Sequence, residues 1–167
     1  MECGILMNRK RINWGCAMIK RWLIPAVLFI LIFTGSASQV FSKEIVVISD
    51  VSFPLDSLSR SQLIQIYTGY LTTLYGKTTL RPMDQKDDQL IKTFFLDKLL
   101  ENTPEEYEDY WSRWKFKTGR MPPMIKPNSK DVIQAVLGGN GVLGYVWDDE
   151  IQGTSGVKVL FKIPLKQ

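Results

Sequence analysis

The run EIVVIS at residues 44–49 is the feature that most constrains the fold of this chain. It contains four consecutive β-branched residues, which favour a strand. Because a strand points alternate side chains to opposite faces, an uninterrupted apolar run predicts a strand that is buried on both faces. That pattern is typical of a parallel sheet, so the rest of the chain is expected to supply helices for both sides.

Four later segments have the pattern of helices. In the first, Ser59 and Gln62 form a capping box, and Gly69 ends the helix. In the third, Thr103 is the cap, Pro104 takes the first helical position and Glu106 completes a capping box. The four helices are expected to begin at Ser59, Asp87, Thr103 and Ser129, with Ser129 as a cap.

Each helix predicts a buried face. The apolar side chains recur at helical spacing, and the third helix carries an aromatic stripe that could be a stacking platform for bases or sugars but more often belongs to a core. The expected buried residues are Leu63, Ile66 and Tyr67, then Ile91, Phe95 and Leu99, then Tyr107, Tyr110, Trp111 and Trp114.

Strands are expected between these helices. TTLRPM (78–83) is expected to be short or near a sheet edge, because Pro82 has no N–H for a ladder. GVLGYV (141–146) and VKVLFKI (157–163) read as further strands. Strands that alternate with helices predict one α/β domain.

The glycine-rich stretch GGNGVLGYV (138–146) resembles a phosphate loop only in composition. A phosphate loop leads from a strand into a helix, whose amino end attracts anions. Here the glycines follow a helix and precede a strand, so they predict a helix end with Gly138 or Gly139 at positive φ. Gly144 is expected to let a neighbouring backbone pass close to the strand.

Residues 1–38 have the features of an export signal. Five basic residues precede the apolar run WLIPAVLFILIFT (22–34), and GSAS (35–38) follows it. A run of about 13 residues is short for a membrane span, which takes about 20. We predict a signal peptide at 1–38, cleaved after Ser38 or alternatively after Ser42 or kept as an anchor, and an α/β domain at 39–167 that is periplasmic or secreted.

The composition of that domain excludes several functions. Removal of residues 1–38 takes away five of the 21 basic and one of the 17 acidic residues, which leaves sixteen of each and gives no reason to expect nucleic acid as a partner. Cys3 and Cys16 both lie in the removed segment, so the domain has no disulfide. Histidine is absent, which excludes histidine-based triads and the usual zinc sites. We expect no cofactor and no metal.

The order of several segments resembles the substrate-binding proteins of bacterial phosphate transporters. LSRSQLIQIYTGYLTTLYGKTTLRPMDQ (58–85) is similar to the family segment Leu-Ser-x-x-x-Leu-x-x-Ile-Phe-x-Gly-Lys. FFLDKLL, TPEEYEDYWSRWKFKTGRMPP and NSKDVIQAVLGGNGVLGYV follow in the family's order, the last close to Pro-Gly-Ala-Ile-Gly-Tyr-Val. The resemblance covers about residues 44–146. It implies a type II periplasmic-binding-protein fold, with a mostly parallel sheet flanked by helices, and an exported protein that binds a solute for ABC-type uptake.

Two departures from that family bear on the ligand. Full-length members have two lobes that close on the ligand, whereas residues 39–167 supply little more than one, matching the second lobe. Phosphate binders of the family carry a Gly-Ser-Gly-Thr-like run where this chain has DQKDDQ (84–89). The carboxylates of Asp84, Asp87 and Asp88 would repel a dianion there.

A small anion would therefore need hydroxyl and basic side chains from elsewhere. Ser49 and Ser52 follow the first strand, and open α/β sheets place ligands at the carboxyl ends of their strands. Arg120 can fork onto an oxyanion, and Arg81 or Lys117 can add charge. These five residues are the predicted ligand site.

Three functions remain open. The first is an exported solute-binding-like protein for phosphate or another small oxyanion. The second is a single-lobe accessory or sensor protein that has lost ligand binding and works with a membrane transporter or sensor, and two copies could face each other as a homodimer. The third is a hydrolase that uses paired carboxylates, either Asp87 with Asp88 or Asp148 with Asp149. Adjacent carboxylates are poorly placed as an acid–base pair, so we expect no enzyme and no catalytic residues.

Overall fold

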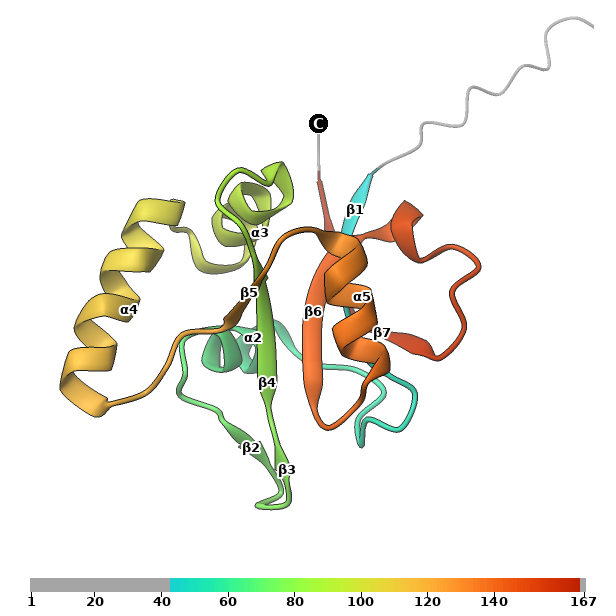
Figure 1. The fold of residues 1–167 in the computed structure, drawn as a ribbon, viewed down its shortest axis with the longest axis horizontal. Helices are drawn as coiled ribbons and strands as arrows, with labels where there is room; N and C mark the ends of the chain where they lie inside the picture. The colour runs from blue at the N-terminus through green and yellow to red at the C-terminus, as the bar shows by residue number, and fades with distance from the viewer. Residues whose placement is uncertain (1–42, 166–167) are drawn as a thin grey trace, which may run out of the picture. The chain divides into compact units, whose positions relative to one another are not determined.

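A five-stranded sheet in the order β5-β4-β6-β1-β7 forms the centre of residues 43–165, the part of the chain that the computed structural model describes (Figure 1). The predicted signal peptide lies outside the described residues. The elements are β1 (Glu44–Asp50), α2 (Arg60–Tyr67), β2 (Thr73–Leu74), β3 (Thr78–Thr79), β4 (Arg81–Gln85), α3 (Leu90–Leu100), α4 (Pro104–Thr118), β5 (Met124–Lys126), α5 (Ser129–Leu137), β6 (Val142–Trp147), the 3₁₀ turn η1 (Asp148–Ile151) and β7 (Val157–Pro164).

Four of the five strands run in one direction. β4 is parallel to both β5 and β6, whereas β1 is antiparallel to both β6 and β7, so β7 points the same way as β6. The predicted α/β class with a mostly parallel sheet is confirmed. The predicted parallel pairing of β1 is wrong, because its apolar run reflects burial on both faces and not the direction of its neighbours.

Helices cover both faces of the sheet, as the run in β1 requires. Ile45 and Val47 belong to a core shared with α2, α3 and α4. Val46 and Ile48 belong to a second, smaller core shared with α5. In Figure 1, α5 crosses in front of β6 while α2 lies behind β4.

Three of the four helices begin at a side-chain cap, whereas α3 has none and begins at Leu90, not at Asp87 as expected. Capping boxes at Ser59 and Thr103 are present as predicted, and the predicted faces of α2 and α3 are buried. In the aromatic stripe of α4, two rings are buried and two are partly buried against the same core, so the stripe is mainly core. The cap of α5 is Asn128 and not Ser129, because the Asn128 side chain accepts from Asp131 N at 3.1 Å.

The strand that contains Pro82 was expected to be short or near a sheet edge, and β4 has five residues but does not lie at an edge. β4 lies between β5 and β6, and it pairs with β6 only at Arg81 and Pro82 and with β5 only from Met83 onward. Pro82 therefore lies before the pairing with β5 begins, where its missing N–H leaves no gap in that ladder.

Two glycines of the 138–146 stretch have distinct roles. Gly139 takes φ +67°, which confirms the predicted turn after α5. Gly144 faces a side chain and not a backbone, because a Cβ at this position would lie 2.2 Å from Cγ1 of Val132. Its absent side chain lets α5 pack closely on β6.

Candidate functional site

The reversed direction of β1 moves Ser49 and Ser52 to the opposite end of the sheet from the one expected. Ser49 pairs with Leu143, near the start of β6. The carboxyl end of β1 therefore lies beside the amino ends of β4 and β6, while α3 and α5 begin at the other end of the sheet. The ligand-site rule for parallel strands does not apply to a strand that runs against its neighbours.

Ser49 is a structural residue in this arrangement. It is fully buried, and its hydroxyl donates to the carbonyl of Val142 at 2.7 Å. The next residue, Asp50, is also buried, and its Oδ2 accepts both the backbone N–H of Ser52 at 3.0 Å and the Ser52 hydroxyl. These contacts fix the turn that follows β1.

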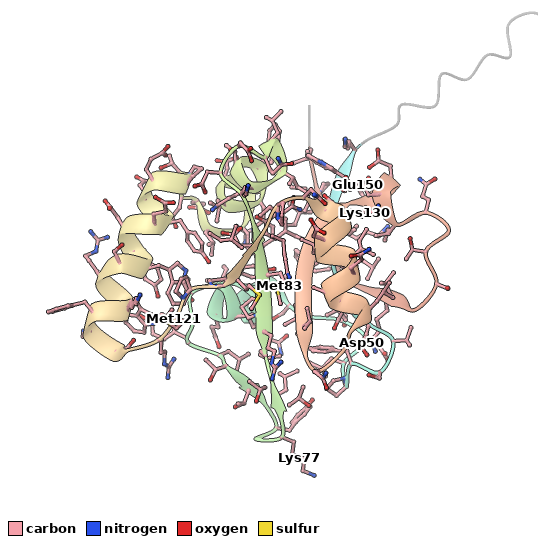
Figure 2. All side chains as sticks on the ribbon, in the orientation of Figure 1. Asp50, Lys77, Met83, Met121, Lys130 and Glu150 are labelled. Carbon is pink, nitrogen blue, oxygen red and sulfur yellow. The ribbon has the colours of Figure 1, made fainter. Side chains whose placement is uncertain are left out.

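Ser52 and Arg81, two of the five predicted residues, line one polar pocket. The cavity has a volume of about 390 Å³ and lies between the turn after β1, the β2–β3 hairpin and the start of β6. Figure 2 shows two of its residues, Asp50 and, at the tip of the hairpin, Lys77. The pocket is lined by Asp50, Ser52, Phe53, Pro54, Lys77, Thr78, Thr79, Arg81, Asn140 and Gly141.

Asn140 and Gly141, near the beginning of the glycine-rich stretch, form one wall of this polar pocket. Residues 139–141 all have positive φ, which brings the turn against the hairpin. A Cβ on Gly141 would lie 2.1 Å from the carbonyl oxygen of Thr79, so only glycine fits there. Two basic side chains and one acidic side chain line the pocket, which gives it a formal charge of +1 and several hydroxyl and amide donors.

Lys117 and Arg120 are not among the residues of that pocket. Lys117 is exposed in the last turn of α4. Arg120 follows α4, and its Nη1 donates to the carbonyl of Gly69. The five predicted residues therefore divide into the polar pocket, a buried serine and the C-terminal end of α4.

A buried ion-pair cluster occupies the region before α3, where the sequence placed repelling carboxylates. Lys92 Nζ lies 3.0 Å from Asp84 Oδ2 and 2.5 Å from Asp87 Oδ1, and Tyr145 donates its hydroxyl to Asp84 Oδ1. The Lys92 side chain is only 2% exposed and that of Asp84 only 5%. In this lysine cluster (Asp84, Asp87, Lys92, Tyr145), one ammonium contacts two carboxylates and offsets one of their two negative charges. The sequence analysis missed this cluster.

The ionisation of the lysine cluster follows from these contacts. Burial lowers the pKa of Lys92, but the Asp84 and Asp87 carboxylates outweigh it and leave the pKa above its ordinary value. The hydrogen bond from Lys92 lowers the pKa of Asp87. Burial, followed by the Asp84 charge, raises the pKa of Tyr145 well above its ordinary value, so its hydroxyl stays protonated and can donate.

In each carboxylate pair considered for hydrolysis, at least one member contacts another group. Asp87 pairs with Lys92, whereas Asp148 accepts the backbone N–H of Glu44 at 3.1 Å and Asp149 lies 3.9 Å from Lys43. Within residues 43–165, no cluster of three metal-ligating side chains is found. No helix in that range is both long and apolar enough to cross a membrane.

Solved structures share this fold. An ABC-type phosphate transport receptor from Vibrio cholerae aligns with a TM-score of 0.54 at 11% identity, and PstS from Borrelia burgdorferi with 0.56 at 12%. A structure described as a phosphate ABC transporter substrate-binding protein with bound phosphate, from Clostridium perfringens, aligns with 0.57 at 17%. The chain has a periplasmic-binding-protein fold. This confirms the resemblance expected from the sequence at the level of the fold.

The alignments are partial in a consistent way. Each covers 71% of this chain but only 46%, 47% and 45% of the three solved chains, so the chain spans about half the length of these proteins. No family model and no curated protein matches the sequence.

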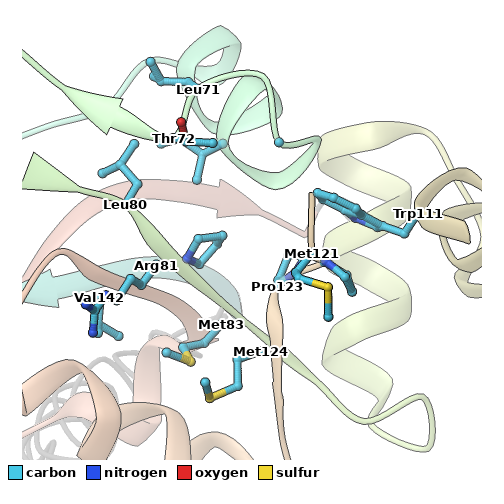
Figure 3. Close-up of a pocket in the computed structure, with 14 residues that line it drawn as sticks. Leu71, Thr72, Leu80, Arg81, Met83, Trp111, Met121, Pro123, Met124 and Val142 are labelled. Atoms are coloured by element: carbon cyan, nitrogen blue, oxygen red, sulfur yellow. The ribbon is translucent and has the colours of Figure 1, made fainter. Parts of the chain in front are cut away.

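A second pocket, between β4 and the segment after α4, has a different character. It has a volume of about 390 Å³ and is mainly apolar, with Trp111, Met83, Met121 and Met124 in its walls (Figure 3). Arg81 lines both this apolar pocket and the polar pocket. The polar pocket is the better binding site for an anion, because hydroxyl groups and a second basic side chain line it.

Proposed function

We propose that the protein is an exported, single-lobe solute-binding protein, and that its polar pocket binds a small oxyanion such as phosphate for ABC-type uptake. The observation that carries this proposal is that Ser52 and Arg81 meet in one pocket with Lys77. The shared fold with phosphate-binding transport proteins supports the class of ligand. The N-terminal signal pattern supports export, which fractionation of the host cell would test.

The electrostatics of the polar pocket favour an anion in spite of Asp50. Asp50 is only 7% exposed, and its carboxylate already accepts hydrogen bonds from Ser52. The guanidinium of Arg81 can form a bidentate contact with an oxyanion, which lysine does not provide. Lys77 lies at the hairpin tip and adds charge when its long side chain turns toward the ligand.

Thermal unfolding with phosphate, sulfate and chloride tests the proposal. A ligand at 100 times its Kd adds about 2.7 kcal/mol to the free energy of unfolding. Arg81→Ala is expected to abolish the shift by phosphate. Arg120→Ala removes the same charge outside the pocket and should keep the shift measured against its own ligand-free protein. Equal shifts for both variants, or none for the wild type, would contradict the proposal.

A single-lobe accessory or sensor protein is the second candidate function. It is favoured by the lysine cluster, which fills the region before α3 with mutually paired side chains. No stabilisation by any oxyanion, together with co-purification of a membrane protein, would favour this function. A homodimer of facing lobes stays a prediction for sedimentation analysis of the purified chain.

A further inference from the structure

The C-terminal end of α4 carries charge of one sign. No acidic residue occurs between Asp109 and Asp131. Within that interval, residues 113–120 contain four basic side chains, those of Arg113, Lys115, Lys117 and Arg120. Residues 105–109, at the other end of the helix, are mainly acidic. The charge therefore changes sign along α4, and its basic end (residues 113–121) forms a distinct surface.

The helix dipole explains only part of this surface. Basic residues in a last turn are stabilised by the negative end of the dipole, which accounts for Lys115 and Lys117. It does not account for Phe116 between them, which is 96% exposed. Nor does it account for Met121, which lies beyond the helix, where Figure 2 labels it, and is 66% exposed. Large apolar side chains at such exposure, set among basic residues, indicate a binding surface.

The geometry of the helix points Phe116 outward. Trp111 is buried and Trp114 is packed against the core, so they mark the inner face of α4. At about 100° per residue, Phe116 lies on the opposite side, with Lys115 and Lys117 on its flanks. Among the described residues, neither lysine forms an ion pair, and Arg113 forms none either, so all three charges are available to a partner.

Neighbouring contacts hold this surface in place. Arg120 donates to the carbonyl of Gly69, which ties the segment after α4 to the loop after α2. In that loop, Tyr70 packs on Trp114 with ring centroids 4.9 Å apart and is itself 61% exposed. The basic end of α4 therefore presents aromatic and methionine side chains beside segments that are joined by these contacts.

We propose that the basic end of α4 docks on the surface of an anionic phospholipid bilayer. Aromatic and apolar side chains flanked by lysine and arginine are the pattern of helices that lie at a membrane interface, where the rings enter the headgroup region and the basic groups meet lipid phosphates. A protein–protein interface of standard size buries about 800 Å² on each partner and has an apolar centre. Here single apolar side chains stand apart among charges, which fits a bilayer better.

Binding to vesicles tests this proposal independently of oxyanion binding. The full chain, as its host cell processes it, is mixed with vesicles of phosphatidylcholine alone or with about one third phosphatidylglycerol, and the bound fraction is measured by sedimentation. A retained N-terminal segment would bind both vesicles through its apolar run and would favour anionic vesicles through its five basic residues, so the variants described next assign the difference to the basic end. We expect stronger binding to anionic vesicles, and loss of the difference at about 1 M salt, where the Debye length is about 3 Å.

A triple variant and a matched control locate the binding. Since each basic residue near an anionic surface raises partitioning about fivefold, three neutral substitutions should lower it about 100-fold. The triple variant is Arg113→Gln, Lys115→Gln and Lys117→Gln, and the control, Lys86→Gln, Lys98→Gln and Lys162→Gln, removes the same charge elsewhere. Phe116→Ser is expected to lower partitioning about tenfold, because burial of the ring is lost.

Three outcomes would overturn the proposal. They are equal binding to neutral and anionic vesicles, equal losses in the triple variant and its control, and binding of the basic end to an acidic protein while anionic vesicles are left free. The circular dichroism of each variant shows whether it is folded before its binding is compared.

Discussion

Removal of Lys92 is expected to destabilise the domain strongly, because it leaves Asp84 buried without its cation. Lys92→Met keeps a side chain of similar length but removes the ammonium that lies 3.0 Å from the Asp84 carboxylate. Breaking a buried ion pair in this way costs about 3–5 kcal/mol. A domain of this size has about 5–15 kcal/mol in total, so the variant should lose roughly a fifth or more of its stability.

Urea unfolding followed by tryptophan fluorescence measures this loss. With a slope of about 2 kcal/mol per molar urea, the midpoint should fall by about 2 M. The matched control is Lys98→Met, because Lys98 pairs with Asp97 at the surface, where the side chains are 45% and 60% exposed. The control should lose less than about 1 kcal/mol.

The double variant Asp84→Asn, Lys92→Met separates the charge from the packing. It removes both partners, so no unpaired charge is buried, and the amide oxygen of asparagine can still accept from Tyr145. We expect it to recover much of the stability that Lys92→Met loses. The reasoning would be refuted if Lys92→Met and Lys98→Met lost equal free energy of unfolding, or if the double variant were less stable than Lys92→Met alone.

The stability difference between the wild type and Lys92→Met depends on pH through two pKa shifts. The raised pKa of Lys92 gives stability that is fully present below the unfolded value of 10.5 and is lost as the pH rises through the folded value above it. The lowered pKa of Asp87 gives stability that is present above 3.8 and is lost as the pH falls through its folded value. The difference between wild type and Lys92→Met should therefore stay flat from roughly pH 5 to pH 9 and shrink beyond 10.5.

The sequence predicted those parts of the fold that depend on neighbouring residues. The caps at Ser59 and Thr103 need only a partner three positions along the chain, and the buried helix faces need only a period of 3.6. The direction of β1 depends on partners about 100 residues away, and an apolar run is the same in either direction. β5 was not predicted, since its three residues, Met124–Lys126, form a strand only because β4 lies beside them.

The candidate site was predicted in part for the same reason. Ser52 and Arg81 were named one at a time, and only the fold shows that they meet in the polar pocket. Lys92 was missed because its partner Asp84 belongs to a different element. In the sequence, Lys92 follows Ile91 and interrupts the apolar face of α3. That break was the available signal, since a lysine on a buried face needs a carboxylate.

Two further substitutions test the walls of the polar pocket. Gly141→Ala should lower the free energy of unfolding by more than about 2 kcal/mol, because positive φ is strained for alanine and its Cβ would lie 2.1 Å from the Thr79 carbonyl oxygen. Gly76→Ala is the control, since Gly76 also has positive φ but nothing lies within 4 Å of its Cβ position. Urea unfolding should show a loss of only about 1 kcal/mol for this control. Ser49→Ala removes the 2.7 Å hydrogen bond to the buried carbonyl of Val142 and should cost about 1–2 kcal/mol. Because Ser49 is fully buried and does not line the polar pocket, its variant should keep the full phosphate shift, and loss of that shift would show that Ser49 contacts the ligand.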